Sequence, residues 1–212
     1  MRLKILCAAL AAPAAAAAIG AYFDGGLTTF GDLETEVGYR GFVGKYYEGL
    51  GASYYVGGGF VVPVWSRAAA VSPSLELVTD AGFTSKKKEV ESIPYEGLEL
   101  SWKTTAVREY AVFGVAIGPA KPFVGFGAGV AIVPWTFTEL NYDVELDADT
   151  EVKAAFGIPF GCEFRLTPYF ALGARAEYLI ITGDVTPDVP VVTVRTSMPD
   201  PFLLTAVARV DF

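Results

Sequence analysis

The chain has 212 residues, of which 52% are hydrophobic and only 19% are charged, and its mean hydropathy is +0.40. That length suits one domain, but the composition is too apolar for an ordinary soluble domain. A formal net charge of −8 gives no reason to bind nucleic acid, and the absence of histidine excludes catalysis by a Ser-His pair or a histidine general base.

The first 18 residues have the pattern of an export signal. Arg2 and Lys4 precede a short apolar run, residues 5–18, which ends in small side chains suited to cleavage near Ala18. A retained anchor is the alternative, but this run is shorter than the ~20 residues that a spanning helix needs, and Pro13 interrupts it. Removal of the signal would leave residues 19–212 as one domain with a formal charge of −10, because both cations leave with it.

The rest of the chain alternates between two faces, most clearly at its C-terminus. One face of the last segment is entirely apolar, consisting of Phe202, Leu204, Ala206, Ala208, Val210 and Phe212. The charges of Arg209 and Asp211 fall on the opposite face, as expected for a strand with one face toward lipid. Residues 152–164 and 170–180 repeat this pattern.

Glycine is concentrated on one face of two further alternating segments, residues 50–64 and 124–132. In the second segment Gly125, Gly127 and Gly129 lie opposite Val, Phe and Ala side chains. Glycine on the inner wall fits a narrow barrel, because large side chains from opposite walls would collide there.

A soluble β-sandwich also alternates, and it is the competing interpretation. Here, however, the polar faces carry Gly, Ala and charge pairs such as Arg175 with Glu177, instead of the Lys, Thr and Ser of a wetted surface. The apolar faces also suit a tilted strand that crosses a bilayer. We therefore predict an all-β fold: a closed antiparallel transmembrane β-barrel in the outer membrane of a diderm (Gram-negative) bacterium.

The connections predict eight strands. Short ones at residues 65–68, 118–121 and 166–169 alternate with long ones at 80–97, 136–150 and 183–200, which would lie outside the cell. This alternation admits only one of two strand-like segments, residues 20–30 and 36–47, as the first strand, and the sequence leaves the choice open.

A ten-strand barrel is the alternative, and it would need a turn within residues 98–116. There, adjacent Arg108 and Glu109 put a charge on the lipid face in either register. We expect a β-bulge near Arg108 to relieve this conflict.

A family resemblance supports the barrel. Residues 120–130 (Ala-Lys-Pro-Phe-Val-Gly-Phe-Gly-Ala-Gly-Val) resemble the Pro-Tyr-Val-Gly-x-Gly strand of small outer-membrane barrels of the OmpW/OmpX type, with Phe123 in place of Tyr. Residues 161–172 are similar to the penultimate hairpin of that family, and Phe212 resembles the terminal aromatic that the barrel-assembly machinery recognises. The resemblance covers most of residues 35–212 and implies the architecture, but its superfamily includes adhesins, stress proteins, channels and enzymes.

Two charged clusters fall in the expected outer loops. The acidic one, which could hold a divalent cation but is more typical of a solvated loop, comprises Glu139, Asp143, Glu145, Asp147, Asp149 and Glu151. The basic one could meet lipopolysaccharide phosphates or simply be solvated, and comprises Lys86, Lys87 and Lys88.

The remaining charges are expected inside the barrel, where they would pair and plug an interior that eight strands leave just wide enough for side chains. They are Arg40, Glu76, Lys153, Glu163, Arg165, Arg175, Glu177, Arg209 and Asp211. Cys162 falls on the lipid face with no base beside it, so it is not a candidate nucleophile.

The sequence therefore predicts no catalytic, cofactor-binding or metal site. We expect a non-enzymatic protein with a plugged lumen and an envelope-structural or surface-interaction role. A narrow channel or conduit for small or apolar solutes is the alternative. The expected partners are outer-membrane lipid, lipopolysaccharide and, through Phe212, the barrel-assembly machinery; a monomer that binds no nucleic acid is expected.

Overall fold

The computed structural model describes residues 19–212 apart from 40–41, 50, 68–70, 93–94, 140–143, 187, 190–191 and 198–199, so the expected signal lies outside the described residues. Within them there is no helix long and apolar enough to cross a membrane. The strands are β1 (Gly20–Phe30), β2 (Asp32–Tyr39), β3 (Phe42–Gly49), β4 (Ala52–Ser66), β5 (Val71–Ser92), β6 (Tyr95–Ile117), β7 (Ala120–Glu139), β8 (Val144–Thr167), β9 (Phe170–Ile181), β10 (Asp184–Val185), β11 (Asp188–Val189), β12 (Val192–Ser197) and β13 (Pro201–Asp211).

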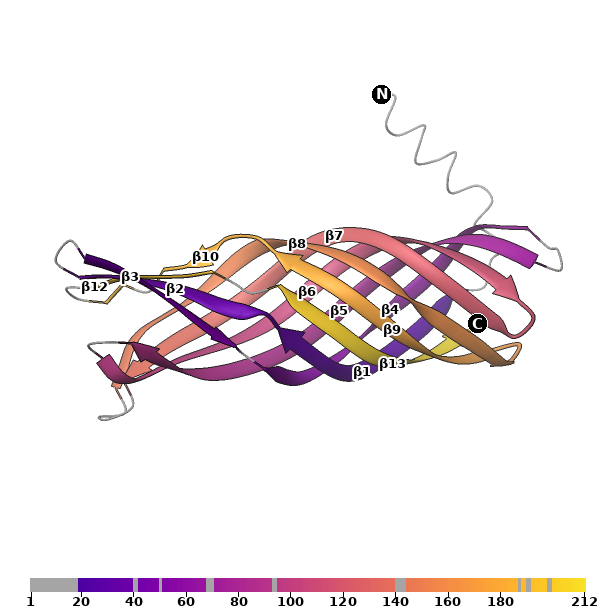
Figure 1. Cartoon of the computed structure of the whole chain (residues 1–212). Coiled ribbons are helices and arrows are strands. Elements are labelled where there is room, and N and C mark those ends of the chain that lie inside the picture. Colours follow the sequence, from indigo (N-terminus) through magenta and orange to yellow (C-terminus); the bar gives the residue numbers. More distant parts are fainter. Residues whose placement is uncertain are drawn as a thin grey trace, which may run out of the picture.

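Eight strands form a closed antiparallel barrel in the order β1-β13-β9-β8-β7-β6-β5-β4, with β1 also pairing β4 (Figure 1). Each strand pairs with its neighbour in sequence where a short connection allows it. Closure occurs where Gly20 meets both Asp211 of β13 and Val61 of β4. The predicted all-β fold and the strand number are confirmed.

The choice of first strand is decided by the second sheet. Residues 20–30 form β1 of the barrel, whereas β2 and β3 form a hairpin in a separate sheet ordered β10-β12-β2-β3, with β11 beside β12. This sheet extends from the end of the barrel opposite to the C-terminus (Figure 1). Both strand-like segments are therefore strands. The alternation of short and long connections still holds, because the β2–β3 hairpin does not belong to the barrel wall.

Three expected outer loops are largely strand instead. β5 continues to Ser92 and β6 starts at Tyr95, while β7 ends at Glu139 and β8 starts at Val144. Much of the third, residues 183–200, belongs to the second sheet. The sequence interpretation was wrong here because polar side chains on a β-ladder above the membrane look like loop when only the apolar belt is taken as strand.

The predicted bulge near Arg108 is also wrong. β6 is unbroken, and Arg108 stays in register with Asp80 of β5 and Gly129 of β7. The register turns Arg108 inward, where it is buried, and leaves Glu109 exposed on the outer wall. The ten-strand alternative is also wrong, because it needed a turn within residues 98–116, where β6 is continuous.

The outer wall of the barrel is an apolar belt. Large side chains point outward there with high exposure, such as Phe23 (70%), Phe60 (62%) and Phe126 (59%). Exposed apolar area of this extent is stable only in lipid. The tight turn at Gly118, whose φ of +60° favours glycine, lies at the barrel end that also holds the starting residue of β1 and the C-terminus. Short turns identify that end as periplasmic.

Candidate functional site

Arg108 of β6 lies at the centre of the lumen and is completely buried together with Asp80 of β5. Its Nη1 donates to Glu177 Oε1 of β9 at 2.7 Å, and its Nη2 donates to the hydroxyl of Tyr55 on β4 at 3.1 Å. The same Nη2 forms the ion pair with Asp80. One guanidinium thus joins three other strands across the barrel.

Arg175 of β9 is the second cation of this site. It pairs with Glu177, with Asp80 at 3.4 Å and with Asp24 of β1 at 3.6 Å. The hydroxyl of Tyr22 donates to Asp80 Oδ1 at 2.7 Å. We call Asp24, Asp80, Arg108, Arg175 and Glu177 the central cluster.

Tyr110 of β6 packs against both guanidinium groups. Its hydroxyl donates to Glu177, while the Cζ atoms of Arg108 and Arg175 lie 5.5 and 5.2 Å from its ring centroid. Both distances are within the range of cation–π attraction. The aromatic ring therefore contacts both cations, and its hydroxyl supplies a donor to the carboxylate that neutralises them.

Inward glycines make room for these tyrosines. A Cβ on Gly82 would lie 2.1 Å from the Tyr55 hydroxyl oxygen, and one on Gly127 would lie 2.3 Å from Cδ1 of Tyr110. A Cβ on Gly157 would meet the Tyr110 hydroxyl oxygen at 2.8 Å. Gly127 belongs to the glycine pattern that predicted a narrow barrel, and it thus marks a place where a tyrosine ring crosses the lumen.

The charges of the central cluster nearly balance. Two guanidinium groups face three carboxylates, and one carboxylate oxygen, Asp24 Oδ1, has no hydrogen-bond partner within the described part of the chain. A buried ion pair stabilises a fold little compared with an apolar packing, but removal of one partner costs about 3–5 kcal/mol because the other charge stays buried and unpaired. The cluster therefore locks its strands together only as a complete set.

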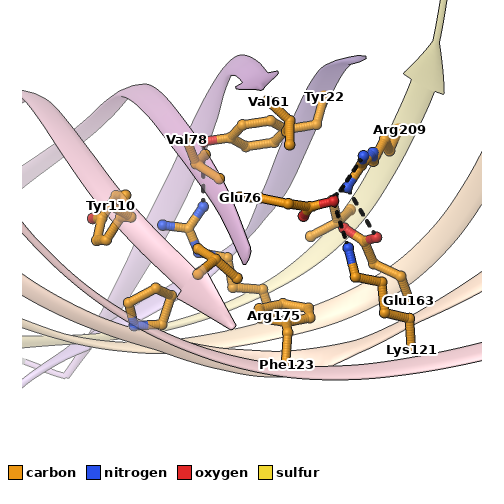
Figure 2. A pocket seen from close by; sticks show the side chains of 13 residues that line it. Tyr22, Val61, Glu76, Val78, Tyr110, Lys121, Phe123, Glu163, Arg175 and Arg209 are labelled. Atoms are coloured by element: carbon orange, nitrogen blue, oxygen red, sulfur yellow. Dashed lines mark hydrogen bonds and ion pairs between the residues drawn. The ribbon is translucent and has the colours of Figure 1, made fainter. Parts of the chain in front are cut away.

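A second charged layer lies toward the periplasmic end and is shown in Figure 2. Arg209 of β13 donates two hydrogen bonds to Glu76 of β5, from Nη1 to Oε2 at 3.1 Å and from Nη2 to Oε1 at 3.2 Å. Lys121 Nζ lies 2.6 Å from Glu76 Oε1, and Glu163 and Asp211 accept from Arg209 at 3.5 and 2.7 Å. Bidentate pairs of this kind are among the stronger charged hydrogen bonds.

Between the two charged layers lies a small cavity of about 40 Å³, lined in part by Tyr22, Val61, Val112 and Phe123 (Figure 2). A water needs roughly 10–15 Å³ measured in this way, so the cavity has room for only a few. A wider vestibule of about 430 Å³ opens at the periplasmic mouth and reaches Arg209.

The extracellular half of the lumen is lined largely by apolar side chains, with the buried threonines Thr28, Thr84 and Thr104 among them. Phe30 packs edge-on against Trp102, with centroids 5.9 Å apart and planes at 80°. The buried members of this aromatic layer are Tyr55, Leu100, Trp102, Ala106, Ala131, Val133, Trp135, Phe137, Ala155, Leu179, Ile181 and Leu203. From the periplasmic vestibule to the extracellular end, the lumen thus contains the second charged layer, the small cavity, the central cluster and the aromatic layer, in that order.

The sheet outside the membrane carries exposed ion pairs. Lys45 of β3 lies 2.8 Å from Glu34 and 2.5 Å from Glu36 of β2, and Arg195 of β12 lies 2.5 Å from Asp184. The hydrogen bond with Glu34, and then that with Glu36, raises the pKa of Lys45 above its ordinary value. We call β2, β3, β10, β11 and β12 the extracellular sheet; β3 is its last strand on one side.

The structure brings together most of the charges predicted to face inward. Glu76, Arg175, Glu177 and Arg209 are buried, and Lys153, Glu163 and Asp211 are half-buried. Arg165 is instead more than half exposed at the periplasmic rim, where its Nη2 pairs with Asp211 at 2.9 Å. Arg40 lies outside the described residues.

Sequence reasoning missed three members of the central cluster. Asp80 was assigned to an outer loop, Arg108 to a bulge, and Asp24 to a segment whose place in the barrel was open. Strict alternation extended through Asp80 and Arg108 would have placed both inward. No local signal shows that they touch, because the register between β5 and β6 brings them together.

The acidic residues expected in an outer loop lie mostly on strands. Glu139 ends β7, while Glu145, Asp147, Asp149 and Glu151 lie on β8; Asp143 lies outside the described residues. Glu151 pairs with Lys153 and accepts from Trp135 Nε1 at 3.3 Å. Among the residues the structure describes, no group of three or more His, Cys, Asp or Glu side chains is placed to hold a metal ion.

The comparisons with known proteins agree with this architecture. No protein-family model and no curated protein matches the sequence. Among solved structures, the outer membrane protein OprG of Pseudomonas aeruginosa is similar with a TM-score of 0.56 and 12% identity, over 91% of this chain and 96% of that one. This chain has the fold of the small outer-membrane β-barrels. The predicted barrel and its outer-membrane location are thereby confirmed, since the apolar belt requires lipid.

Two further structures resemble the chain less closely. Neisserial surface protein A gives a TM-score of 0.48 and 16% identity, over 92% of this chain and 97% of that one. The outer membrane protease OmpT of Escherichia coli gives 0.44 and 9%, over 92% and 97%.

Proposed function

We propose that this protein is a non-enzymatic outer-membrane barrel with a plugged lumen, which anchors the extracellular sheet at the cell surface. The observation that carries the proposal is the central cluster. Its side chains come from β1, β5, β6 and β9 and meet at the barrel axis, and the aromatic layer lies directly above them. Such an interior holds the wall together and leaves no continuous aqueous path.

The chemistry of the carboxylates supports a structural role for them. Both oxygens of Glu177 are engaged, Oε1 by Arg108 and Tyr110 and Oε2 by Arg175. A carboxylate saturated in this way is not available as a general acid or base. Substitution of Glu177 is therefore expected to change stability and not to abolish a reaction.

A narrow channel is the second candidate, favoured by the periplasmic vestibule and the cavity above it. Planar-bilayer recording of the folded protein separates the two. We expect no conductance steps and no solute uptake by vesicles, because the central cluster bridges the lumen. A porin of known conductance, recorded in the same bilayers, is the positive control, and the gel shift between unboiled and boiled barrel confirms that the protein under test is folded. Current through the unmodified protein would overturn the plugged-lumen proposal.

The surface role rests on where the extracellular sheet lies. Its lysine, Lys45, is half exposed, and Val43 beside it is 69% exposed. A membrane-impermeant amine reagent applied to intact cells should label Lys45 and should not label Lys121, which is 14% exposed in the periplasmic layer. Labelling of Lys121 without Lys45 would place the sheet on the wrong side of the membrane and contradict the proposal.

A further inference from the structure

A group of hydroxyl and ammonium side chains lies on the outer wall of β5, β6 and β7. The register sets Ser85 opposite Lys103 and Lys87 opposite Ser101, and Ser101 opposite Thr136. Two lysines therefore take diagonal corners of one rectangle, about 7–8 Å apart by ordinary sheet geometry, with serines at the other corners. We call Ser85, Lys87, Ser101, Lys103 and Thr136 the lysine patch.

These side chains surround a depression in the wall of about 280 Å³, which Pro134 also lines. The β6–β7 ladder pairs Trp102 with Trp135 and resumes only at Thr105 with Ile132. Proline has no N–H to donate, so the ladder is interrupted beside Lys103. The patch is thus a hollow in the wall with two ammonium groups at its rim.

The position of the lysine patch along the barrel axis indicates which part of the membrane it contacts. The first apolar outward side chains below it on the three strands are Phe83, Val107 and Ile132, which are 41%, 42% and 40% exposed and belong to the apolar belt. The next outward residues toward the extracellular end are polar or proline. The patch therefore lies where the apolar belt ends, at the level of the headgroups of the extracellular leaflet.

The charge of the patch is positive and only partly neutralised. Lys87 Nζ lies 3.2 Å from Glu99, which is 24% exposed, whereas Lys103 makes no ion pair with any residue that the structure describes. The patch thus contains two of the chain's eight lysines, although the net charge of the chain is −8. Two lysines and flanking hydroxyls suit one ligand group above all, a phosphate at a membrane surface.

We propose that the lysine patch binds the phosphate of a lipid A-type glycolipid in the extracellular leaflet. Lys103 supplies one cation and Lys87 the second, while Ser85 and Ser101 supply hydrogen bonds to phosphate oxygens. Acyl chains of the same molecule would lie along Phe83, Val107 and Ile132. This inference rests on the outer-membrane barrel of the proposed function but not on the plugged lumen. If the lumen is not plugged, the bilayer recordings show conductance, and lipid binding is unaffected.

Native mass spectrometry of the full mature barrel, folded in a zwitterionic detergent, tests the proposal with diphosphorylated lipid A as the probe. We expect a bound lipid whose apparent affinity falls about fivefold in Lys103→Gln and in Lys87→Gln, and that is weakened by salt. Lys45→Gln is the matched control, because it removes one exposed lysine charge from the extracellular sheet; it should bind as the unmodified protein does. The gel shift confirms that each variant is folded.

Three outcomes would overturn the proposal. One is unchanged binding in both patch variants, which would show that the lysines do not contact the lipid. Another is equal binding of dephosphorylated lipid A, which would show that only the acyl chains are recognised. The third is displacement of lipid A by millimolar inorganic phosphate, which would identify a free-anion site instead of a lipid site.

Discussion

The central cluster and the extracellular sheet use the same kind of ion pair in opposite surroundings. Arg108 and Asp80 are 0% exposed, whereas Lys45 and Glu34 are 51% and 36% exposed. Water already solvates the exposed pair, so its loss changes the free energy of unfolding by about 0–1 kcal/mol. Water cannot reach the buried set, so each partner depends on the others. Ion pairs of similar length, such as Arg108–Glu177 at 2.7 Å and Lys45–Glu34 at 2.8 Å, therefore contribute unequally to stability in the two regions.

The largest effect is expected from Arg108→Met. It leaves Asp80, Glu177 and the Tyr55 hydroxyl without their shared donor, so the free energy of unfolding should fall by about 3–5 kcal/mol. Urea titration of the folded barrel in vesicles, followed by tryptophan fluorescence, measures it. A loss below that of Lys45→Met would show that Arg108 does not hold the cluster together.

A smaller loss is expected from Gly82→Ala. The new methyl group would lie 2.1 Å from the Tyr55 hydroxyl oxygen, which must move away from Arg108, so the loss should be about 1–3 kcal/mol. Gly31→Ala is the control, because nothing lies within 4 Å of a Cβ there. Equal stability of the two variants in the same urea titration would refute the close packing of tyrosine against glycine.

Substitution of Glu109 is expected to raise the free energy of unfolding, whereas the two preceding substitutions lower it. Glu109 is exposed on the outer wall, opposite Thr79 of β5 and Ala128 of β7. Glu109→Leu should raise the free energy of unfolding by about 1 kcal/mol, because a carboxylate toward lipid is destabilising, though less than Lys or Arg. Glu145→Leu, exposed above the belt on β8, should change little. Destabilisation by Glu109→Leu would mean that this carboxylate has a partner in the membrane.

The smallest effect is expected from Lys45→Met. Its two ion pairs with Glu34 and Glu36 lie in water, so the free energy of unfolding should change by no more than about 1 kcal/mol. High salt should reduce even that difference. A loss as large as that of Arg108→Met would contradict the contrast between the two regions.

Alternation predicted which way most side chains point. It placed Phe212, Val210 and the other apolar residues of the last strand outward and Arg209 inward, because period-two geometry is local and holds for any strand. It failed at Arg108 only because a charge on the lipid face was considered too costly. In the structure the charge on the lipid-facing wall is that of Glu109, and the same register turns Arg108 into the buried central cluster.

The ends of the strands could not be predicted in the same way. Residues 84–92 and 144–151 are polar and look like loop, but they continue β5 and β8 beyond the membrane. Similarly, β2 and β3 have strand patterns, but nothing local tells a barrel strand from one in a separate sheet. That choice depends on closure, which occurs where β1 reaches β13 and β4 together.

The sequence alone determined the fold class and the two faces of most strands, because both follow from spacing along the chain; it favoured eight spans but left ten as an alternative and the first span undecided. Only the tertiary structure decided which charges meet. Asp24, Asp80, Arg108 and Arg175 lie on four strands, and barrel closure and register bring them within bonding distance. The lysine patch has the same origin, since register places Lys87 and Lys103 at the corners of one hollow. Contacts between strands are set by the whole closed ring, and no short segment contains that information.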